Sequence, residues 1–453
     1  MSTARRKTLF LSGLLFLFCL TALGQESDTV RVMRMFNATD TMYVFTKAQR
    51  DSIRALVQET KTFGDFTPGK GFELAHGKHG SVNFSTYVLL RWVDQVPEQQ
   101  QVKDHLGRER TLDPRNDIQW HRSYLYFNGW AFTPKFVWQV NTWSVLSTGQ
   151  ILLIGSITYR FHKAFNLSGG INGLPTTRSM LGSHPLWQSN DRALADEYFR
   201  AGFSSGIWAN GEITPRLRYT ATVMNNLSQL GVNATQLTRD LGTGFNLEWT
   251  PTTGEFGPRG AYGDWEHHEQ LATRFGGGYG HCREDRFNQD LSGKTLNTQV
   301  KISDSQNLFE VGALADSVTV MKALWQQFAL DAGFKYKGWF LHVEYFQRLL
   351  NQFEADGPLP ISEINENGYM VQLSAFPIKQ KLEVYGFHSA VNGKWNKPME
   401  LGGGLNLYPF NSRYFRVNAH AMHVQESSAN SVFGFYLGGM TGMTYSIGVS
   451  FIL

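Results

Sequence analysis

Cysteine is almost absent from this sequence of 453 residues. Of its two cysteines, Cys19 lies in an apolar N-terminal leader, so a mature chain would keep Cys282 alone. A single cysteine cannot form an intramolecular disulfide, and it cannot build a zinc site from several thiolates. The sequence therefore excludes a disulfide-stapled secreted domain and a cysteine-based zinc module.

Excess charge and long hydrophobic runs are also missing beyond the leader. The formal net charge of +4 includes three units from Arg5, Arg6 and Lys7, which leaves +1 for the rest of the chain. Any basic site must therefore be local, and no nucleic-acid partner is expected. No later stretch reaches the roughly 18 apolar residues of a membrane-spanning helix, so none is predicted.

The leader itself has the layout of a secretory signal peptide. A basic start precedes an apolar stretch over residues 9–20, and Ala22-Leu23-Gly24 supplies the small residues of a cleavage site. We therefore expect residues 1–24 to direct export and to be removed. Residues 25–80, with one helical stretch at 47–59, are predicted to form a short N-terminal periplasmic segment.

The end of the chain alternates between apolar and small residues. Met443, Tyr445, Ile447, Val449 and Phe451 stand at every second position. Period-two alternation is typical of a strand with one face toward lipid and the other toward a lumen. Together with 45 glycines, 33 Phe, 17 Tyr and 12 Trp, it predicts an all-β protein. We expect a transmembrane antiparallel β-barrel over residues 81–453.

Sixteen candidate strands follow from the same pattern, and an even number returns both ends of a barrel to one side. Most connections fit the rule of short periplasmic turns and long outer loops, although residues 251–270 are long on the inner side. The candidate strands lie near residues 81–93, 118–128, 135–143, 151–160, 164–171, 198–209, 216–225, 242–250, 271–282, 326–337, 339–348, 368–376, 381–390, 400–408, 413–423 and 443–453.

Strand parity turns basic side chains toward the lumen, because a lipid-facing Arg or Lys near the midplane costs roughly 2–4 kcal/mol. Rings of such side chains favour anions, although a single inward arginine can instead pair with Asp331, Glu344 or a loop carboxylate. The predicted lumen-facing residues are Arg91, Arg122, Arg216, Arg218, Arg274, Lys335, Arg348 and Arg416. The third outer loop, residues 172–197, adds Arg178 and Arg192, and with Arg200 these are the candidates for a pore constriction.

Two motifs suggest chemistry but lack its structural context. Residues 202–206 match G-x-S-x-G, yet a nucleophile elbow needs a strand, a sharp turn and a helix, whereas Ile207-Trp208-Ala209 prolongs a strand. In the run 265–269, His267 and His268 are adjacent and would diverge, so a solvated turn is a better interpretation than a metal site. We expect no catalytic residue, no metal and no cofactor, and hence no enzyme.

Three segments resemble the phosphate-selective porin O and P family. They are Trp120-His121-Arg122 before a strand that ends Phe127-Asn128-Gly129, residues 191–209, and residues 251–257. The resemblance extends over roughly residues 63–453. It implies a sixteen-stranded, trimeric porin whose third outer loop folds into the pore. Because the mature chain is nearly neutral, phosphate selectivity does not follow from the resemblance alone.

We therefore predict an outer-membrane porin of a Gram-negative bacterium, embedded in lipid as a homotrimer. It would form a water-filled channel for passive diffusion of small hydrophilic solutes, constricted by loop 172–197, with anions or phosphate as the class that inward arginines would favour. Two alternatives stay open. One is a β-barrel enzyme acting on lipid or surface polymer, and the other is a surface-binding adhesion barrel that uses loop 283–325.

Overall fold

The structure, a computed structural model, describes residues 71–145, 150–182, 185–226, 240–286, 297–430 and 434–453, together with three short strands. These are β1 (Thr29–Arg31), β2 (Val44–Thr46) and β3 (Asp65–Thr67). The chain forms two compact units, the first of residues 1–65 and 74–76 and the second of residues 66–73 and 77–453. In the first unit β1 and β2 pair antiparallel. The predicted signal peptide and helix 47–59 lie outside the described residues.

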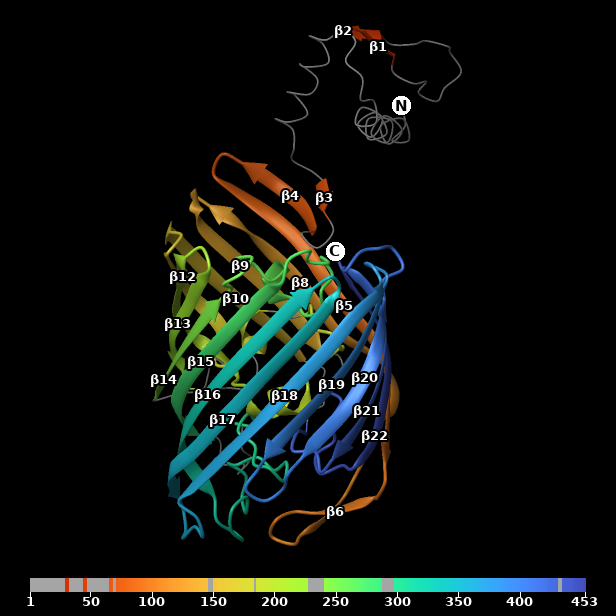
Figure 1. Ribbon diagram of the computed structural model, residues 1–453. Coiled ribbons are helices and arrows are strands. Elements are labelled where there is room, and N and C mark those ends of the chain that lie inside the picture. The colour runs from red at the N-terminus through yellow and green to blue at the C-terminus, as the bar shows by residue number, and fades with distance from the viewer. Residues whose placement is uncertain are drawn as a thin grey trace, which may run out of the picture. The chain divides into compact units, whose positions relative to one another are not determined.

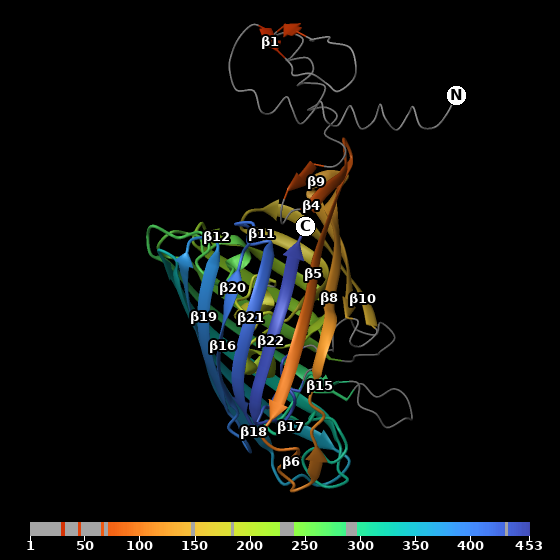
Figure 2. The same cartoon turned by 90° about the vertical axis from the view of Figure 1, so that its right-hand side faces the viewer.

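The second unit is a closed antiparallel β-barrel of sixteen strands (Figures 1 and 2). One further strand, β4 (Gly71–Gly77), precedes them. The barrel strands are β5 (Gly80–Pro97), β8 (Asn116–Ala131), β9 (Thr133–Val145), β10 (Gln150–His162), β11 (Phe165–Gly173), β12 (Phe203–Thr214), β13 (Leu217–Asn225), β14 (Leu241–Trp249), β15 (Ala272–Asp285), β16 (Val320–Tyr336), β17 (Trp339–Ala355), β18 (Glu363–Ile378), β19 (Leu382–Asn392), β20 (Met399–Leu407), β21 (Phe415–Gln425) and β22 (Gly442–Ile452).

Each strand overlaps one of the sixteen predicted from alternation, so the predicted fold class is confirmed. Strand β22 pairs with β5 along its length and closes the barrel, which leaves no unpaired backbone edge at the seam. None of the helices within the described residues has the length and apolar character needed to cross a membrane.

The parity predicted for the last strand is also correct. Tyr445 and Ile447 are 38% and 52% exposed on the outer face, whereas Thr444 and Ser446 are 0% and 1% exposed and point inward. The other strands repeat this arrangement, with large apolar side chains exposed on the outside of the barrel. An apolar exterior is stable only against hydrocarbon, because contiguous patches of this size are rare on soluble monomers.

The connections follow the expected asymmetry, with one correction. At the β16–β17 turn, Lys337 and Gly338 have φ values of 47° and 87°, as a two-residue type I′ hairpin requires. The predicted long outer loop 349–367 is wrong in extent, because β17 and β18 continue to pair as far as Asn351 and Glu363. Backbone hydrogen bonds between strands form whatever the side chains are. The β17–β18 hairpin therefore continues through polar residues beyond the region of apolar alternation.

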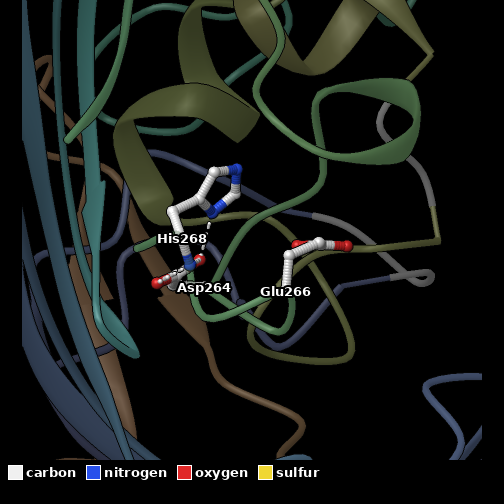
Figure 3. A group of neighbouring side chains, drawn as sticks. All are labelled: Asp264, Glu266 and His268. Carbon is white, nitrogen blue, oxygen red and sulfur yellow. Dashed lines mark hydrogen bonds and ion pairs between the residues drawn. The ribbon is translucent and has the colours of Figure 1, made fainter. Parts of the chain in front are cut away.

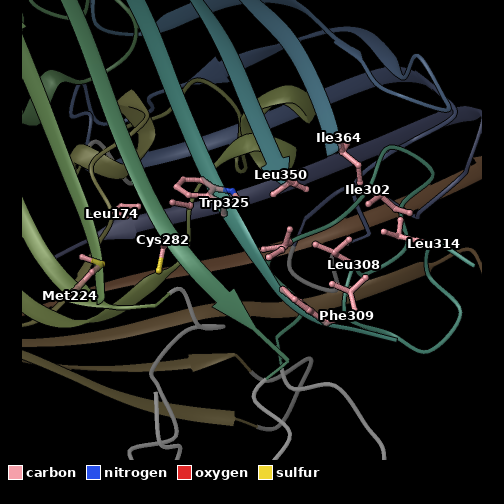
Figure 4. Packing of buried hydrophobic residues seen from close by; sticks show 14 residues of the cluster. Leu174, Met224, Cys282, Ile302, Leu308, Phe309, Leu314, Trp325, Leu350 and Ile364 are labelled. Carbon is pink, nitrogen blue, oxygen red and sulfur yellow. The ribbon is translucent and has the colours of Figure 1, made fainter. Parts of the chain in front are cut away.

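Where the structure describes them, the first outer loop and the loop before β16 are packed rather than loose. Val300, Ile302, Leu308 and Phe309 are buried in one cluster with Trp325 of β16 (Figure 4). Two arginines of the first outer loop also join this cap: Arg108 Nη2 donates to Gln306 Oε1 and the carbonyl of Gly312, and Arg110 Nη2 donates to Ser305 Oγ and the carbonyl of Gly438. The loop between β6 (Gln101–Lys103) and β7 (Glu109–Thr111) is thereby tied to two others.

Candidate functional site: the barrel interior

The third outer loop folds into the barrel. We call residues 174–202 the interior loop; it contains the 3-10 helix η2 (Arg178–Leu181) and the α-helix α3 (Leu194–Phe199). Tyr198 donates to Glu366 Oε2 at 2.6 Å, and the backbone N–H of Leu194 donates to Glu400 Oε1 at 2.6 Å. Arg348 in turn pairs with Glu366 at 2.7 Å and lies over the ring of Tyr198. Charged side chains of β17, β18 and β20 therefore hold α3 against one wall.

A second segment enters from the periplasmic side. We call residues 250–271 the inner segment; it contains the 3-10 helix η3 (Pro258–Gly260). Lys335 donates to the carbonyls of Phe256 and Ala261 at 2.9 and 2.7 Å, which fixes the segment to β16. The backbone N–H of Tyr262 donates to the carbonyl of Leu186 in the interior loop at 2.9 Å. The unexpected length of this connection is explained, because it is a second insertion into the barrel.

Arg178 joins the two insertions. Its Nη1 lies 2.8 Å from His342 Nδ1, its Nη2 donates to the carbonyl of Gly260 at 2.8 Å, and its guanidinium lies 4.1 Å from the ring centroid of Tyr262. The backbone N–H of Arg178 donates to Glu344 Oε1 at 2.9 Å. Arg178 is 2% exposed, so this residue acts first as a packing junction.

The other two predicted constriction residues also have carboxylate partners. Arg200 makes a two-pronged contact with Glu197, at 2.9 and 3.1 Å. Arg192 Nε lies 3.6 Å from Asp196 Oδ2, and its guanidinium stacks over Trp187. Arg178 and Arg192 lie in the predicted loop, whereas the strand predicted from residue 198 begins only at Phe203 and Arg200 caps α3 instead. The charges of all three arginines are compensated locally.

Six of the eight predicted lumen-facing basic residues are buried inside the barrel: Arg91, Arg122, Arg274, Lys335, Arg348 and Arg416. Their partners are carboxylates or backbone carbonyls. Arg122 lies 2.9 Å from Asp191 Oδ2 of the interior loop, and Arg416 Nη1 donates to the carbonyl of Gln188 at 3.2 Å in the same loop. These residues anchor the insertions as much as they line a lumen.

The remaining two lie near the periplasmic rim. Arg216 is exposed on the turn between β12 and β13 and donates to the carbonyl of Pro251, so it does not face the mid-lumen. Arg218 is exposed to the interior space and lies 3.2 Å from Glu212 and 3.4 Å from Glu248.

Open space remains on the opposite side of the interior loop, along the inward faces of β8 to β14. Cavities of about 380 and 860 Å3 share the side chains of Leu181, Asn210 and Thr220, and a third of about 530 Å3 shares Asn172 and Asn210 with the first. The insertions are therefore fixed mainly to β15–β22 and, through Arg91 and Arg122, to β5 and β8, whereas the cavities lie along the inward faces of β8–β14.

Sequence reasoning missed the residues that decide this arrangement. Glu366 and Glu400, which hold α3, have inward parity in their strands, and that parity was a signal that could have found them. Lys135, Arg160 and Lys163, which line the largest cavity, stand at strand ends where parity is a poor guide.

The histidine run of the inner segment differs from the predicted solvated turn. Asp264 and His268 are buried, and Asp264, Glu266 and His268 place possible metal ligands within 4.8 Å of one another (Figure 3). However, His268 Nδ1 bonds Asp264, His268 Nε2 lies 2.7 Å from Glu255 Oε1, and Glu266 lies 2.6 Å from Arg413. Each charge already has a protein partner, so the contacts are those of an ion-pair network.

This network shifts two pKa values in opposite directions. The hydrogen bond to Asp264 raises the pKa of His268, although burial opposes it. Burial would raise the pKa of Asp264, but hydrogen bonds from His268 and from the backbone of Gly338 lower it overall. The contacts with Asp264 and Glu255 therefore favour the protonated form of His268.

The G-x-S-x-G motif has no elbow. Phe203–Thr214 is one continuous strand, and the buried Ser204 Oγ donates to the carbonyl of Asn226 at 3.0 Å. The expected strand context is confirmed, and the hydroxyl is used to tie β12 to the end of β13.

Comparisons with known proteins bear on the fold. No protein-family model matches the chain, and no curated protein sequence matches it. Among solved structures, it is similar to outer-membrane expressed OmpT of Vibrio cholerae, with a TM-score of 0.53, 13% identity and coverage of 83% of this chain and 99% of the other. It is also similar to an anion-selective porin from Comamonas acidovorans, with a TM-score of 0.50, 13% identity and coverage of 83% and 100%.

These similarities, at such low identity, concern the fold. The fold is that of the outer-membrane β-barrels. With its apolar exterior and closed seam, the chain is located in the outer membrane of a Gram-negative bacterium, as predicted.

Proposed function

We infer that this protein is a porin, a channel for passive diffusion of small hydrophilic solutes across the outer membrane. The observation that carries this proposal is a set of three adjoining cavities, of about 380, 530 and 860 Å3, inside the closed barrel. Backbone groups of a closed barrel are satisfied by their neighbours, so the interior can hold water and polar side chains without exposing them to lipid.

A preference for anions is the finer part of the proposal. The described residues lining the two cavities of about 380 and 860 Å3 include nine basic side chains and four acidic ones, and the exposed Lys135, Arg160 and Lys163 carry the argument because several of the others are paired with carboxylates. Local field, rather than the net charge of the chain, decides which ions enter a narrow passage. The basic residues are Arg122, Lys135, Arg160, Lys163, Arg178, Arg192, Arg200, Arg218 and Arg274, and the acidic ones are Asp191, Glu197, Glu212 and Glu248.

Reversal potentials in planar bilayers under a salt gradient test both parts. Discrete open steps support the channel, and a potential of the sign set by anions supports the preference. Replacement of Arg160 and Lys163 by Ala should lower the anion preference, because both are exposed side chains beside the largest cavity. The control replaces Lys379 and Lys381, exposed at the β18–β19 turn, by Ala. Equal shifts for the two double variants, or a cation-selective parent, would remove the anion preference.

Arg108 and Arg110 of the first outer loop would be an unsuitable control pair, because these residues join outer loops and their loss would disturb the cap. Charges farther from the passage than roughly 10 Å are largely screened at 0.1 M salt, which makes the periplasmic turn the better choice.

The remaining parts of the proposal come from the sequence. They are membership of the phosphate-selective porin O and P family, a homotrimer, a cleaved signal peptide over 1–24 and a periplasmic segment over 25–80. Enzymatic activity is not part of the proposal, and the adhesion alternative is not favoured by an outer loop whose described residues 297–319 are largely packed into the cap. A silent bilayer together with lipid or polymer hydrolysis would instead favour the enzyme.

A further inference from the structure

The wall that faces the open space differs in chemistry from the wall that holds the insertions. The cavity of about 530 Å3 is lined by hydroxyl side chains, by amides and by the apolar or aromatic residues Val137, Trp138, Ile171 and Trp208, and Arg160 is the one charged group among its described lining residues. The amides are those of Asn128, Gln139, Asn166, Asn172 and Asn210. They come from β8, β9, β11 and β12, so four strands present one uncharged polar surface.

Strand register makes this surface continuous. Asn128 of β8 stands opposite Gln139 of β9, and Asn166 of β11 stands opposite Asn210 of β12. Thr158 and Ser168 face each other between them, with their hydroxyls 2.8 Å apart. Each amide offers two donors and one acceptor, and each hydroxyl offers both roles.

Aromatic rings adjoin the amides in the cavity of about 380 Å3. Tyr124 stacks with Trp143 at 5.4 Å and 8° and with Tyr126 at 5.5 Å and 3°. Trp208 lines both this cavity and the one rich in amides. Flat apolar faces and neutral hydrogen-bonding groups thus share one passage.

The charged groups beside these rings are compensated. Arg122 lies 2.9 Å from Asp191, and Arg200 contacts Glu197 through two nitrogens. An ion pair whose charges cancel attracts neither cations nor anions strongly. Its remaining N–H groups and carboxylate lone pairs can still form hydrogen bonds with the hydroxyl groups of a solute.

We propose that this surface binds the ring of an uncharged carbohydrate of mono- or disaccharide size. A sugar ring has C–H faces that can pack on aromatic rings and peripheral hydroxyls that both donate and accept, which matches rings flanked by amides. An inorganic anion would meet one exposed cation here, Arg160, but would leave the aromatic rings and most of the amides unused, and a plain aromatic solute would leave the amides without partners. The cavities fall within the roughly 300–1,000 Å3 typical of small-molecule sites. The inference rests on the proposed channel and names its solute class.

The test measures ion current through single channels of the full-length protein while maltose is added. Saturable reduction of the current is expected in the parent, beyond the effect of a poly(ethylene glycol) of similar hydrodynamic size. If open channels respond to maltose and glucose only as they do to the polymer, the carbohydrate site is refuted while the channel stands. If no open steps occur, the proposed function fails and the inference fails with it.

Two variants locate the site. Trp208→Ala should raise the half-saturating maltose concentration roughly tenfold, which corresponds to about 1.4 kcal/mol. Asn210→Ala should act in the same direction and serves if the first variant does not assemble. The matched control is Trp249→Ala, which removes the same side chain from the exposed outer face of β14 and should leave half-saturation unchanged. Saturable block that neither interior variant alters would refute this location.

Discussion

Removal of the Arg178 guanidinium should loosen the interior loop. The side chain bonds His342 of β17 and the carbonyl of Gly260 in the inner segment, and it packs on Tyr262. In Arg178→Ala these side-chain contacts are lost, while the backbone bond between Tyr262 and Leu186 and the anchors of α3 on Glu366 and Glu400 remain. The barrel itself should assemble normally, because its strand pairing is untouched.

The size of the effect follows from the contacts. Hydrogen bonds to charged groups contribute about 1.5–3 kcal/mol each, and a desolvated cation–π contact contributes about 2 kcal/mol. Because Arg178 lines the cavity of about 860 Å3, water can enter and satisfy part of what is lost. A net loss of about 3 kcal/mol is therefore reasonable, and it would raise the undocked fraction of η2 on the order of a hundredfold.

Single-channel recording is the assay. Arg178→Ala should show more current noise and a larger mean conductance than the parent, because the loop borders the space through which solutes are proposed to move. The sequence alone suggested a different result, a loss of anion preference, because Arg178 was predicted to act as a constriction charge. Lys379→Ala, a lysine exposed on a periplasmic turn, is the matched control for loss of one positive charge. Unchanged conductance and noise together with a shifted reversal potential would refute the junction role and restore the constriction role.

Two further predictions concern assembly and pH. Ile447→Asp, at an outward site that is 52% exposed, should reduce the amount of heat-modifiable folded protein in outer-membrane fractions. Ser446→Asp on the inward face serves as a comparison. Equal assembly of Ile447→Asp and the parent would contradict the lipid-facing assignment of Ile447. Because the pKa of His268 is raised in the folded state, its stabilisation of the inner segment is complete below the unfolded-state pKa and is lost as pH rises through the folded-state pKa. Because the pKa of Asp264 is lowered in the folded state, its stabilisation is complete above the unfolded-state pKa and is lost as pH falls through the folded-state pKa. Proteolysis of the inner segment should thus be slowest in mildly acidic buffer and faster above neutral pH. In His268→Gln the proteolysis rate should no longer increase above neutral pH. The same pH profile for parent and variant would contradict this prediction.

The fold was predictable because a lipid-facing surface imposes period two on every strand. In β22 the alternation of Tyr445 and Ile447 with Thr444 and Ser446 survives in the exposures. The hairpin beyond Leu349 was not predictable in the same way, since outside the bilayer nothing forces its outward residues to be apolar. The number and order of the strands follow from the apolar alternation that contact with lipid imposes. The length of a strand outside the bilayer depends on backbone pairing alone.

The candidate site was predictable only in part, for a different physical reason. Parity gives the direction of a side chain but not the group that stands across from it. Arg91 donates to the carbonyl of Gly434, 343 residues away, and Arg122 meets Asp191, 69 residues away. No local pattern encodes such pairs, so the sequence located the inward charges but could not separate anchors from groups open to solutes.

The division of the interior into two walls follows from the cost of burying charge. An insertion into a barrel brings backbone N–H and carbonyl groups away from water, and each must find a partner. Charged residues of β15 to β22, such as Lys335 and Glu400, supply those partners and are no longer available to solutes. The amides of β8 to β12 that line the cavity of about 530 Å3 meet no such requirement and can remain uncharged. Selectivity in this barrel should therefore depend on the amide and aromatic surface of β8 to β12 and on the exposed cations at its periplasmic end, rather than on the number of arginines that point inward.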